Sequence, residues 1–259
     1  MLLAIDVGNT HTVLGLFVGE DVVEHWRVAT DARRTADELA VVLRSLLAQY
    51  HGEGGAAVTG IALCSTVPAV LHEMRAMCRR YYGDVPTVVV EPGVRTGVPV
   101  LTDNPKEVGT DRIVNSLAAV ELYGGPALVV DFGTATTFDA VSAKGEYVGG
   151  AISPGIDISL EALGRRGAQL RKVELLRPRT VIAKNTVEAL QSGILYGFAS
   201  QVDGIVGRMR EELGLARDQL KVIATGGLAP MVVEECSEVT DHQPWLTLLG
   251  LEIVFERNQ

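Results

Sequence analysis

The chain has 259 residues, of which 47% are hydrophobic and only 5% aromatic, and its formal net charge is −9. An acidic chain is poorly suited to nucleic acid or to an anionic membrane surface, so we expect neither as its main partner. The length exceeds that of a usual single domain, and two halves, 1–125 and 126–259, fit the usual domain size.

The first residues and the cysteines indicate a protein of the cytoplasm. Met1–Ile5 carries no basic residue, and Asp6 interrupts this run before the core of a signal peptide could form. No apolar run approaches the roughly 20 residues that span a bilayer. Cys64, Cys78 and Cys236 are odd in number and far apart, so we expect reduced, core or half-buried thiols without disulfide or metal-binding roles.

The first half is predicted to open with three strands and to continue with helices and strands in alternation. Apolar residues recur at helical spacing between residues 35 and 49, which predicts an amphipathic helix. A later helix is expected to end at Gly124-Gly125, a pair that suits a C-cap. The expected elements are strands near 2–7, 12–18 and 22–29, a helix at 35–49, a strand at 60–64, a helix from Pro68, a strand at 87–90, a polar loop at 91–105 and a helix at 106–123.

The second half repeats this succession of elements. The expected elements are strands at 127–131, 136–142 and 146–152, helices at 156–167 and 185–213, a strand at 221–224, and helices at 229–235 and 244–257. Three strands followed by alternating helices and strands, twice over, predict an α/β fold made of two similar ribonuclease-H-like halves with a nucleotide cleft between them. This is the fold of the superfamily of actin, the sugar kinases and the heat-shock-chaperone ATPases.

Two aspartate–glycine turns support the duplication. Asp6-Val-Gly-Asn-Thr10 and Asp131-Phe-Gly-Thr-Ala135 each follow an apolar run and stand 125 positions apart. A carboxylate at a strand end can hold a cation, and glycine lets successive backbone N–H groups approach a phosphate closely. The alternative is that Gly8-Asn9 is simply a hairpin turn. If the chain had only one aspartate–glycine turn, this alternative would receive roughly half the weight. The second copy lowers that weight considerably.

One segment of this acidic chain is rich in basic residues. Seven basic residues and a single acid, Glu174, lie between positions 165 and 184. A solvated surface is the favoured interpretation, and a rim that attracts an anionic substrate is the alternative. The basic residues are Arg165, Arg166, Arg171, Lys172, Arg177, Arg179 and Lys184.

Six sequence blocks together resemble the type III pantothenate kinases over nearly the whole chain. Each block alone is weak, because similar turns recur across the superfamily, but six in the same order and spacing are specific. The blocks are Asp6-Val-Gly-Asn-Thr10, Asn104-Pro-Lys-Glu-Val-Gly-Thr-Asp-Arg112, Asp131-Phe-Gly-Thr-Ala-Thr-Thr137, Gly149-Gly-Ala-Ile-Ser-Pro-Gly155, Asn185-Thr-Val-Glu-Ala-Leu-Gln-Ser-Gly193 and Ala224-Thr-Gly-Gly-Leu228. The resemblance implies ATP-dependent phosphorylation of pantothenate to 4′-phosphopantothenate, the first step of coenzyme A synthesis, and a homodimer.

The resemblance also implies roles for individual residues. The first phosphate loop would consist of Asp6, Val7, Gly8, Asn9, Thr10, His11, Thr12 and Val13. Asp6 would hold Mg²⁺ through water, and Thr134 would be a second ATP contact. Asp131 would coordinate a monovalent cation, K⁺ or NH₄⁺. The turn Thr225-Gly-Gly227 would lie near the adenosine, and pantothenate would be bound by Gly109, Thr110, Asp111, Arg112 and Thr186.

Asp111 is the expected general base. Phosphoryl transfer requires an aligned hydroxyl, cations on the phosphates and a carboxylate that accepts the hydroxyl proton. Arg112 offers a planar guanidinium that could hold the pantothenate carboxylate. The alternative is an adjacent ion pair on an exposed helix turn, which the resemblance makes the minor interpretation.

Two residues differ from the family pattern at positions that bear on substrate affinity. His11 stands where many relatives carry Asn or a small polar residue, and its charge could make activity sensitive to pH near neutrality. Thr102 stands where many relatives carry Tyr, so one pantothenate contact is missing or replaced. Two rival functions are a kinase for another small acceptor, which the Gly109–Arg112 segment and Thr186 argue against, and a non-catalytic nucleotide-binding regulator, which Asp111 and the acidic charge argue against.

Overall fold

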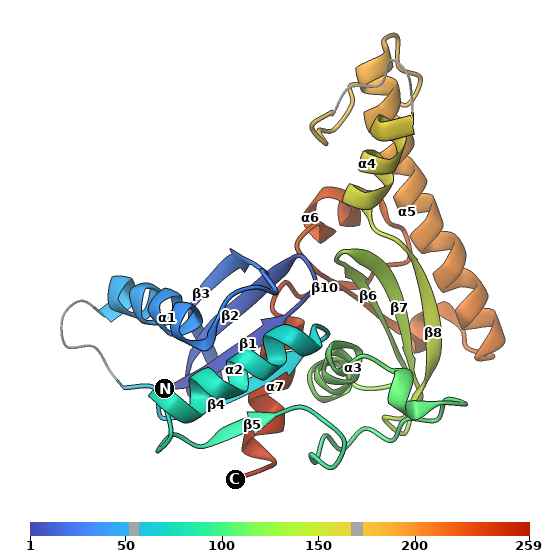
Figure 1. The fold of residues 1–259 in the computed structure, drawn as a ribbon. Helices are drawn as coiled ribbons and strands as arrows, with labels where there is room; N and C mark the ends of the chain where they lie inside the picture. Colours follow the sequence, from blue (N-terminus) through green and yellow to red (C-terminus); the bar gives the residue numbers. More distant parts are fainter. Residues whose placement is uncertain (52–56, 167–172) are drawn as a thin grey trace. The chain divides into compact units, whose positions relative to one another are not determined.

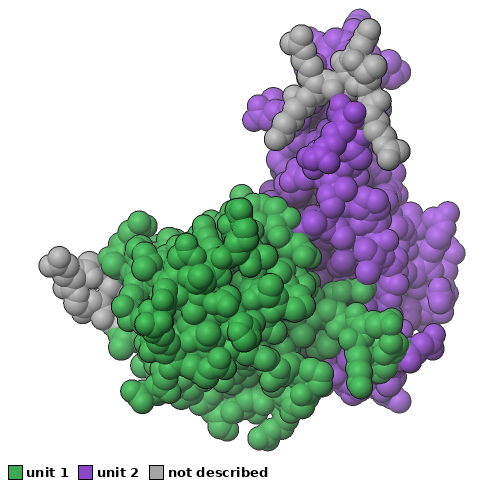
Figure 2. All heavy atoms as spheres, in the orientation of Figure 1, with its two compact units in different colours: residues 1–97, 104–118, 247–259 green, residues 98–103, 119–246 purple. Residues whose placement is uncertain are grey.

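The computed structural model describes residues 1–51, 57–166 and 173–259. They form two compact units, and the chain passes from one to the other more than once (Figures 1 and 2). Unit 1 comprises residues 1–97, 104–118 and 247–259, and unit 2 comprises residues 98–103 and 119–246. No helix within the described ranges is long and apolar enough to cross a bilayer. The division of the sequence at 1–125 and 126–259 stays a prediction.

Unit 1 is built on a five-stranded sheet with the strand order β3-β2-β1-β4-β5. The strands β1 (Leu2–Val7), β2 (His11–Val18) and β3 (Asp21–Ala29) form an antiparallel meander, whereas β4 (Gly60–Ser65) and β5 (Thr87–Val89) continue the sheet in parallel with β1. The central strands β1 and β4 are almost wholly buried, and the edge strand β3 alternates between exposed and half-buried residues. Because β1 is hydrogen-bonded to a strand on each side, the position of its carboxyl end is well defined within the unit.

Helices cover both faces of this sheet. The helices α1 (Ala36–His51) and α2 (Pro68–Tyr81) pack on the face formed by Leu3, Ile5 and Val7. The C-terminal helix α7 (Leu246–Glu256) packs on the other face, where Phe255 lies against Gly60 of β4 so closely that a side chain at Gly60 would overlap its ring. Since alternate strand residues point to opposite faces, Asp6 lies on the face of α7, away from α1 and α2.

Unit 2 repeats the arrangement. Its strand order, β10-β9-β6-β7-β8, again places three antiparallel strands beside parallel ones. The strands are β6 (Ala127–Phe132), β7 (Ala135–Val141), β8 (Tyr147–Pro154), β9 (Lys221–Thr225) and β10 (Asp241–His242). The helices α4 (Ile156–Arg166), α5 (Thr186–Glu212) and α6 (Ala229–Val232) accompany this sheet, and α5 contributes Leu195, Val202 and Val206 to its core. The two sheets match the predicted duplicated ribonuclease-H-like fold.

Several element boundaries differ from the sequence prediction. The helix expected from residue 106 is split into a 3₁₀ turn at Pro105–Glu107 and α3 (Thr110–Tyr123), because Val108 between them is extended. The helix expected at 229–235 is also split, into α6 and a 3₁₀ turn at Val233–Glu235. The strand β10 was missed because two residues are too few to show an alternating pattern.

Candidate active site

Two carboxylates form the centre of the candidate site in unit 1. Asp6 is the penultimate residue of β1, and Asp111 is the second residue of α3. The pKa of Asp6 is raised from 3.8 to about 7, first by burial and then by the charge of Asp111, while a hydrogen bond from the Cys64 thiol opposes the rise. Residues 105 positions apart are therefore close enough for their charges to interact.

Asp111 is desolvated and has unused hydrogen-bonding capacity. Its Oδ1 atom is buried and finds no hydrogen-bond partner among the described residues. Burial raises the pKa of Asp111, whereas the backbone N–H and the positive charge of Arg112 lower it. A carboxylate oxygen that is buried without a donor is costly, which is the usual signature of a group kept for a ligand or for chemistry.

The start of α3 is held against the end of β4. Thr110 donates its hydroxyl to the Ser65 carbonyl at 3.4 Å, and the Thr66 N–H donates to the Val7 carbonyl at 3.0 Å. Gly109 leaves room for the Asp111 carboxylate, because a Cβ at this position would collide with Oδ1. Sequence analysis did not select Ser65 and Thr66; the signal was a Ser-Thr pair at the carboxyl end of a buried strand.

The first aspartate–glycine turn closes a β-hairpin. The Gly8 N–H donates to the His11 carbonyl at 3.0 Å, and β1 pairs with β2 up to Val7 opposite Thr12. The side chains of Asn9, Thr10 and His11 are exposed, whereas those of Val7 and Thr12 are buried. The hairpin alternative is thus correct for the local structure. It leaves the exposed turn residues accessible to a phosphate.

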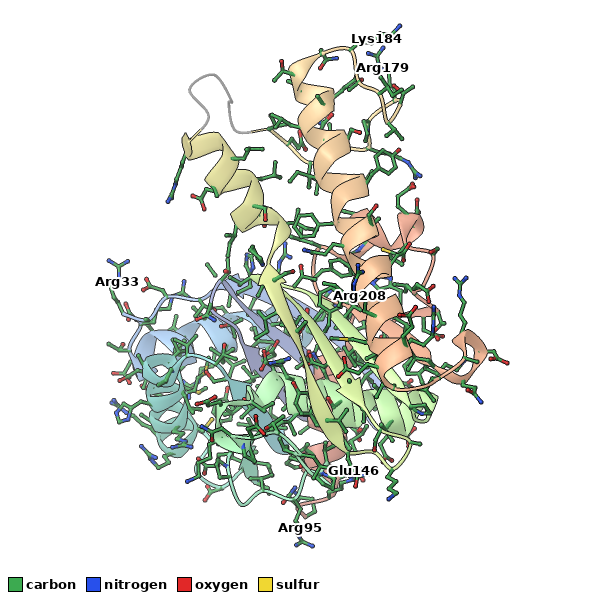
Figure 3. The ribbon with its side chains drawn as sticks, turned by 90° about the vertical axis from the view of Figure 1, so that its right-hand side faces the viewer. Arg33, Arg95, Glu146, Arg179, Lys184 and Arg208 are labelled. Atoms are coloured by element: carbon green, nitrogen blue, oxygen red, sulfur yellow. The ribbon has the colours of Figure 1, made fainter. Side chains whose placement is uncertain are left out.

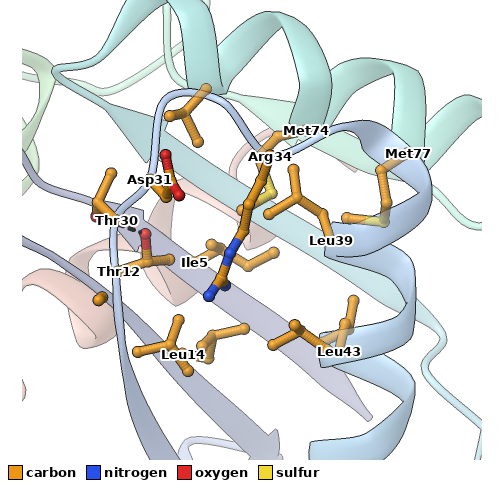
Figure 4. Close-up of a pocket in the computed structure, with 14 residues that line it drawn as sticks. Ile5, Thr12, Leu14, Thr30, Asp31, Arg34, Leu39, Leu43, Met74 and Met77 are labelled. Atoms are coloured by element: carbon orange, nitrogen blue, oxygen red, sulfur yellow. Dashed lines mark hydrogen bonds between the residues drawn. The ribbon is translucent and has the colours of Figure 1, made fainter.

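The first turn is also tied to the segment that follows β3. The Thr30 N–H donates to the Thr10 carbonyl at 3.0 Å, and the hydroxyls of Thr12 and Thr30 lie 2.9 Å apart (Figure 4). The cavity beside this pair is lined mainly by apolar side chains such as Ile5, Leu43 and Met77, and its volume of about 30 Å³ is that of one water molecule. It lies on the α1 and α2 face, away from Asp6, and Thr12 is the residue of the first turn that lines it together with its neighbour Leu14.

In unit 2 the second turn meets a segment that is distant in sequence. The Gly133 N–H donates to the Ala135 carbonyl two residues on at 3.0 Å, whereas the Gly8 N–H of the first turn donates to a carbonyl three residues on. Asp131 of β6 pairs with Thr225 of β9, and Gly226 follows with a positive φ of 93°. A Cβ at Gly226 would lie 2.6 Å from the Phe132 nitrogen. The predicted cation residue and the predicted adenosine turn are therefore neighbours.

Thr186 lies apart from the other predicted residues of unit 2. It is the first residue of α5, exposed, and preceded by Asn185, whose side chain caps the helix by accepting from the Glu188 N–H at 2.9 Å. This end of α5 lies with Arg179 and Lys184 at the tip of unit 2, beyond the end of the sheet from which α4 extends (Figures 1 and 3).

The described members of the basic segment favour a solvated surface. Arg165 pairs with Glu161 at 2.6 Å, and Arg177 pairs with Glu234 at 2.9 Å. Arg179 donates to Glu188. Arg171 and Lys172 and the side chain of Arg166 lie outside the described residues. Exposed pairs of this kind contribute little stability, and they leave less positive charge for a ligand.

Comparisons with known proteins identify the family. The sequence profile described as type III pantothenate kinase matches residues 2–208. The chain belongs to the type III pantothenate kinase family. The type III pantothenate kinase of Streptomyces avermitilis is 70% identical, with 100% of this chain and 98% of the relative covered, and that of Thermobifida fusca is 68% identical with both chains fully covered.

Solved structures agree with the fold of a type III pantothenate kinase. A Campylobacter jejuni protein of the Baf family has a TM-score of 0.62 at 17% identity, with 99% of this chain and 98% of that chain covered. The inorganic polyphosphate/ATP-glucomannokinase of an Arthrobacter strain has a TM-score of 0.53 at 15% identity, with 100% and 99% covered. At these identities the likeness establishes the shared fold alone.

Two residues of this type III pantothenate kinase depart from the family pattern expected from its sequence. His11 is exposed, so the imidazole is not needed for packing. The Thr102 hydroxyl is buried and has no hydrogen-bond partner among the described residues of the chain. The expected effects of His11 and Thr102 on substrate binding stay predictions.

Proposed function

We propose that this chain phosphorylates pantothenate with ATP to give 4′-phosphopantothenate, the first step of coenzyme A biosynthesis, with Asp111 as the general base. Membership of the type III pantothenate kinase family supports the reaction. The observation that carries the role of Asp111 is its buried Oδ1, which accepts no hydrogen bond from the described residues, while the charge of Asp111 acts on Asp6.

In this mechanism Asp111 takes the proton of the primary hydroxyl as that oxygen attacks the γ-phosphorus. The new oxygen–phosphorus bond forms while the bond to the bridging oxygen of ADP breaks, and the carboxyl group afterwards releases the proton to solvent. Burial raises the pKa of Asp111, which makes its carboxylate a stronger base toward an alcohol. The contacts of Thr110 and Gly109 fix the direction of the carboxylate at the start of α3.

Asp6 and the turn from Val7 to Val13 would bind the phosphates. A carboxylate whose pKa is raised by burial and by a second carboxylate gains from a divalent cation, and oxygen ligands suit Mg²⁺. Mg²⁺ commonly keeps several waters and is held by one or two carboxylates together with phosphate oxygens of the substrate. Bound with ATP, Mg²⁺ would neutralise the charge of the phosphates.

Other residues complete the proposal. Asp131, beside the backbone of the Gly226 turn, would hold K⁺ or NH₄⁺, and Thr134 in the same turn would contact ATP. Arg112 would bind the carboxylate of pantothenate in a bidentate pair.

A homodimer acting in the cytoplasm is also proposed. The outer end of unit 2 exposes large apolar side chains around Thr186, namely Leu176 (51% exposed), Val181 (62%), Ile182 (86%) and Val187 (50%). Such a concentration is typical of a surface that a partner covers. Burial there would bring Thr186 into contact with a second copy. Light scattering at working concentration tests this, and a monomeric mass would contradict it.

The test of function is ADP release by the purified protein with ATP and Mg²⁺, with and without pantothenate. Asp111→Asn is expected to lower kcat by about 10² to 10⁴, because it removes the base while keeping the shape of the side chain. Replacing K⁺ with Na⁺ tests the cation proposed at Asp131. Turnover that does not depend on pantothenate, or an Asp111→Asn variant as fast as wild type, would refute the corresponding part of the proposal.

A further inference from the structure

A buried thiol contacts the candidate active site. Cys64 is fully buried in β4, opposite Asp6 in the register of the parallel strands β1 and β4. Paired residues on neighbouring strands point to the same face, and the Cys64 Sγ atom lies 3.3 Å from Asp6 Oδ1. The sequence alone suggested only a core cysteine at this position.

The geometry makes this thiol a donor to the carboxylate. A thiol S–H can donate a hydrogen bond, whereas an ionised carboxylate only accepts. Unlike lysine, a neutral donor leaves the negative charge of Asp6 available for a cation.

We propose that Cys64 is a positioning residue of the kinase, whose thiol holds Asp6 Oδ1 and thereby fixes the direction in which the Asp6 carboxylate faces. The inference rests on the proposed function. A free carboxylate rotates in a broad two-fold well about its last side-chain bond, so one donor to Oδ1 is enough to select an orientation. Asp6 Oδ2 then keeps a constant orientation relative to Oδ1 and the β1 backbone, and it would stay available to the cation bound with ATP.

Loss of the Cys64 thiol is predicted to weaken the use of ATP and the binding of metal, and to leave the affinity for pantothenate unchanged. Cys64→Ala removes the donor, and we expect kcat/KM for ATP to fall about tenfold, as is usual when the hydrogen-bond partner of a metal-binding residue is lost. Cys64→Ser restores a donor in the same place and is expected to recover most of the loss. The KM for pantothenate should stay within about twofold in both variants.

Cys78 provides the matched control. It is a second buried cysteine of unit 1, on α2, and its pKa is raised by burial with no carboxylate contributing. Cys78→Ala and Cys78→Ser should leave the kinetics unchanged. A general effect of losing a buried thiol would appear equally in the Cys78 and Cys64 variants.

Two measurements report on Asp6 without turnover. Mn²⁺ binding in the presence of a non-hydrolysable ATP analogue, followed by electron paramagnetic resonance, should weaken about tenfold in Cys64→Ala and recover in Cys64→Ser. In a Cys78→Ala/Cys236→Ala background, infrared spectroscopy isolates the S–H stretch of Cys64. We expect that stretch to shift when Asp6→Ala is added, because the acceptor is removed.

The outcomes separate this inference from the proposed function. Wild-type kinetics and Mn²⁺ affinity in a folded Cys64→Ala protein, or a Cys64→Ser variant as impaired as Cys64→Ala, would overturn the positioning role. If Cys64→Ala does not fold, an S–H stretch that is insensitive to Asp6→Ala would overturn it. If the protein does not phosphorylate pantothenate but Mn²⁺ binding is weakened in Cys64→Ala, the positioning role would be supported. Only the assignment of pantothenate as the acceptor would then be refuted.

Discussion

Replacement of Asp6 by Asn is expected to stabilise the metal-free protein at high pH. The pKa of Asp6 is raised from 3.8 to about 7 by burial and by the charge of Asp111. A carboxyl group whose pKa is higher in the folded state than in the unfolded state favours folding less when it is ionised. The ionised Asp6 carboxylate therefore destabilises the folded state. This destabilisation is absent below about pH 4, grows as the pH rises and is complete above about pH 7.

The magnitude follows from the two pKa values. A rise from 3.8 to about 7 corresponds to about 4 kcal/mol, at about 1.4 kcal/mol for each pH unit. Asp6 keeps some contact with solvent, so we expect about half of this, roughly 2 kcal/mol. Asn has the same shape and can still accept the hydrogen bond from Cys64. Asp6→Asn should thus be about 2 kcal/mol more stable than wild type at pH 8 and differ by well under 1 kcal/mol at pH 4.

Urea unfolding in EDTA at both pH values measures this difference. Asp84→Asn, at an exposed position of the same unit, is the control for loss of one surface charge and should have little effect at either pH. In a second arm, Mg²⁺ with a non-hydrolysable ATP analogue should stabilise wild type more than Asp6→Asn. A stability difference that is the same at pH 4 and pH 8, or an Asp6→Asn protein less stable at pH 8, would refute the reasoning.

Four further substitutions test packing, helix formation and substrate binding. Gly60→Ala should destabilise by about 1–3 kcal/mol in urea unfolding, because a methyl group there overlaps the ring of Phe255; an unchanged midpoint would mean that α7 can move aside. Gly197→Ala, in the middle of α5 with nothing within 4 Å of the added methyl, should instead stabilise by about 0.5–1 kcal/mol, and a loss of stability would contradict the open environment. Asn185→Ala should cost about 1 kcal/mol of stability by removing the cap of α5. An unchanged stability would contradict this and would mean that Glu188 alone fixes the start of the helix. Arg112→Ala should raise the KM for pantothenate by about 10- to 100-fold in the ADP-release assay while the KM for ATP stays nearly constant, and equal changes in both would refute a pantothenate-specific role.

The sequence by itself determined the duplicated fold and the family. The turns at Asp6 and Asp131 follow apolar runs of strand length, and each is followed by strand patterns and then by helical periodicity. These are local signals, because alternation and helical spacing depend on neighbouring residues only. Six motifs in order then restricted the family, which the comparisons confirmed.

Only the tertiary structure decided which side chains share an environment. The contact between Cys64 and Asp6 depends on the register of two strands 58 residues apart, and the link between Thr110 and Ser65 depends on how α3 packs at the end of that sheet. Desolvation of Asp111 likewise has no local signal, since a charged residue in the first turn of a helix is ordinarily exposed. Register and burial are set by packing between segments distant in the chain, and that packing gives two ordinary aspartates and a cysteine their unusual proton affinities.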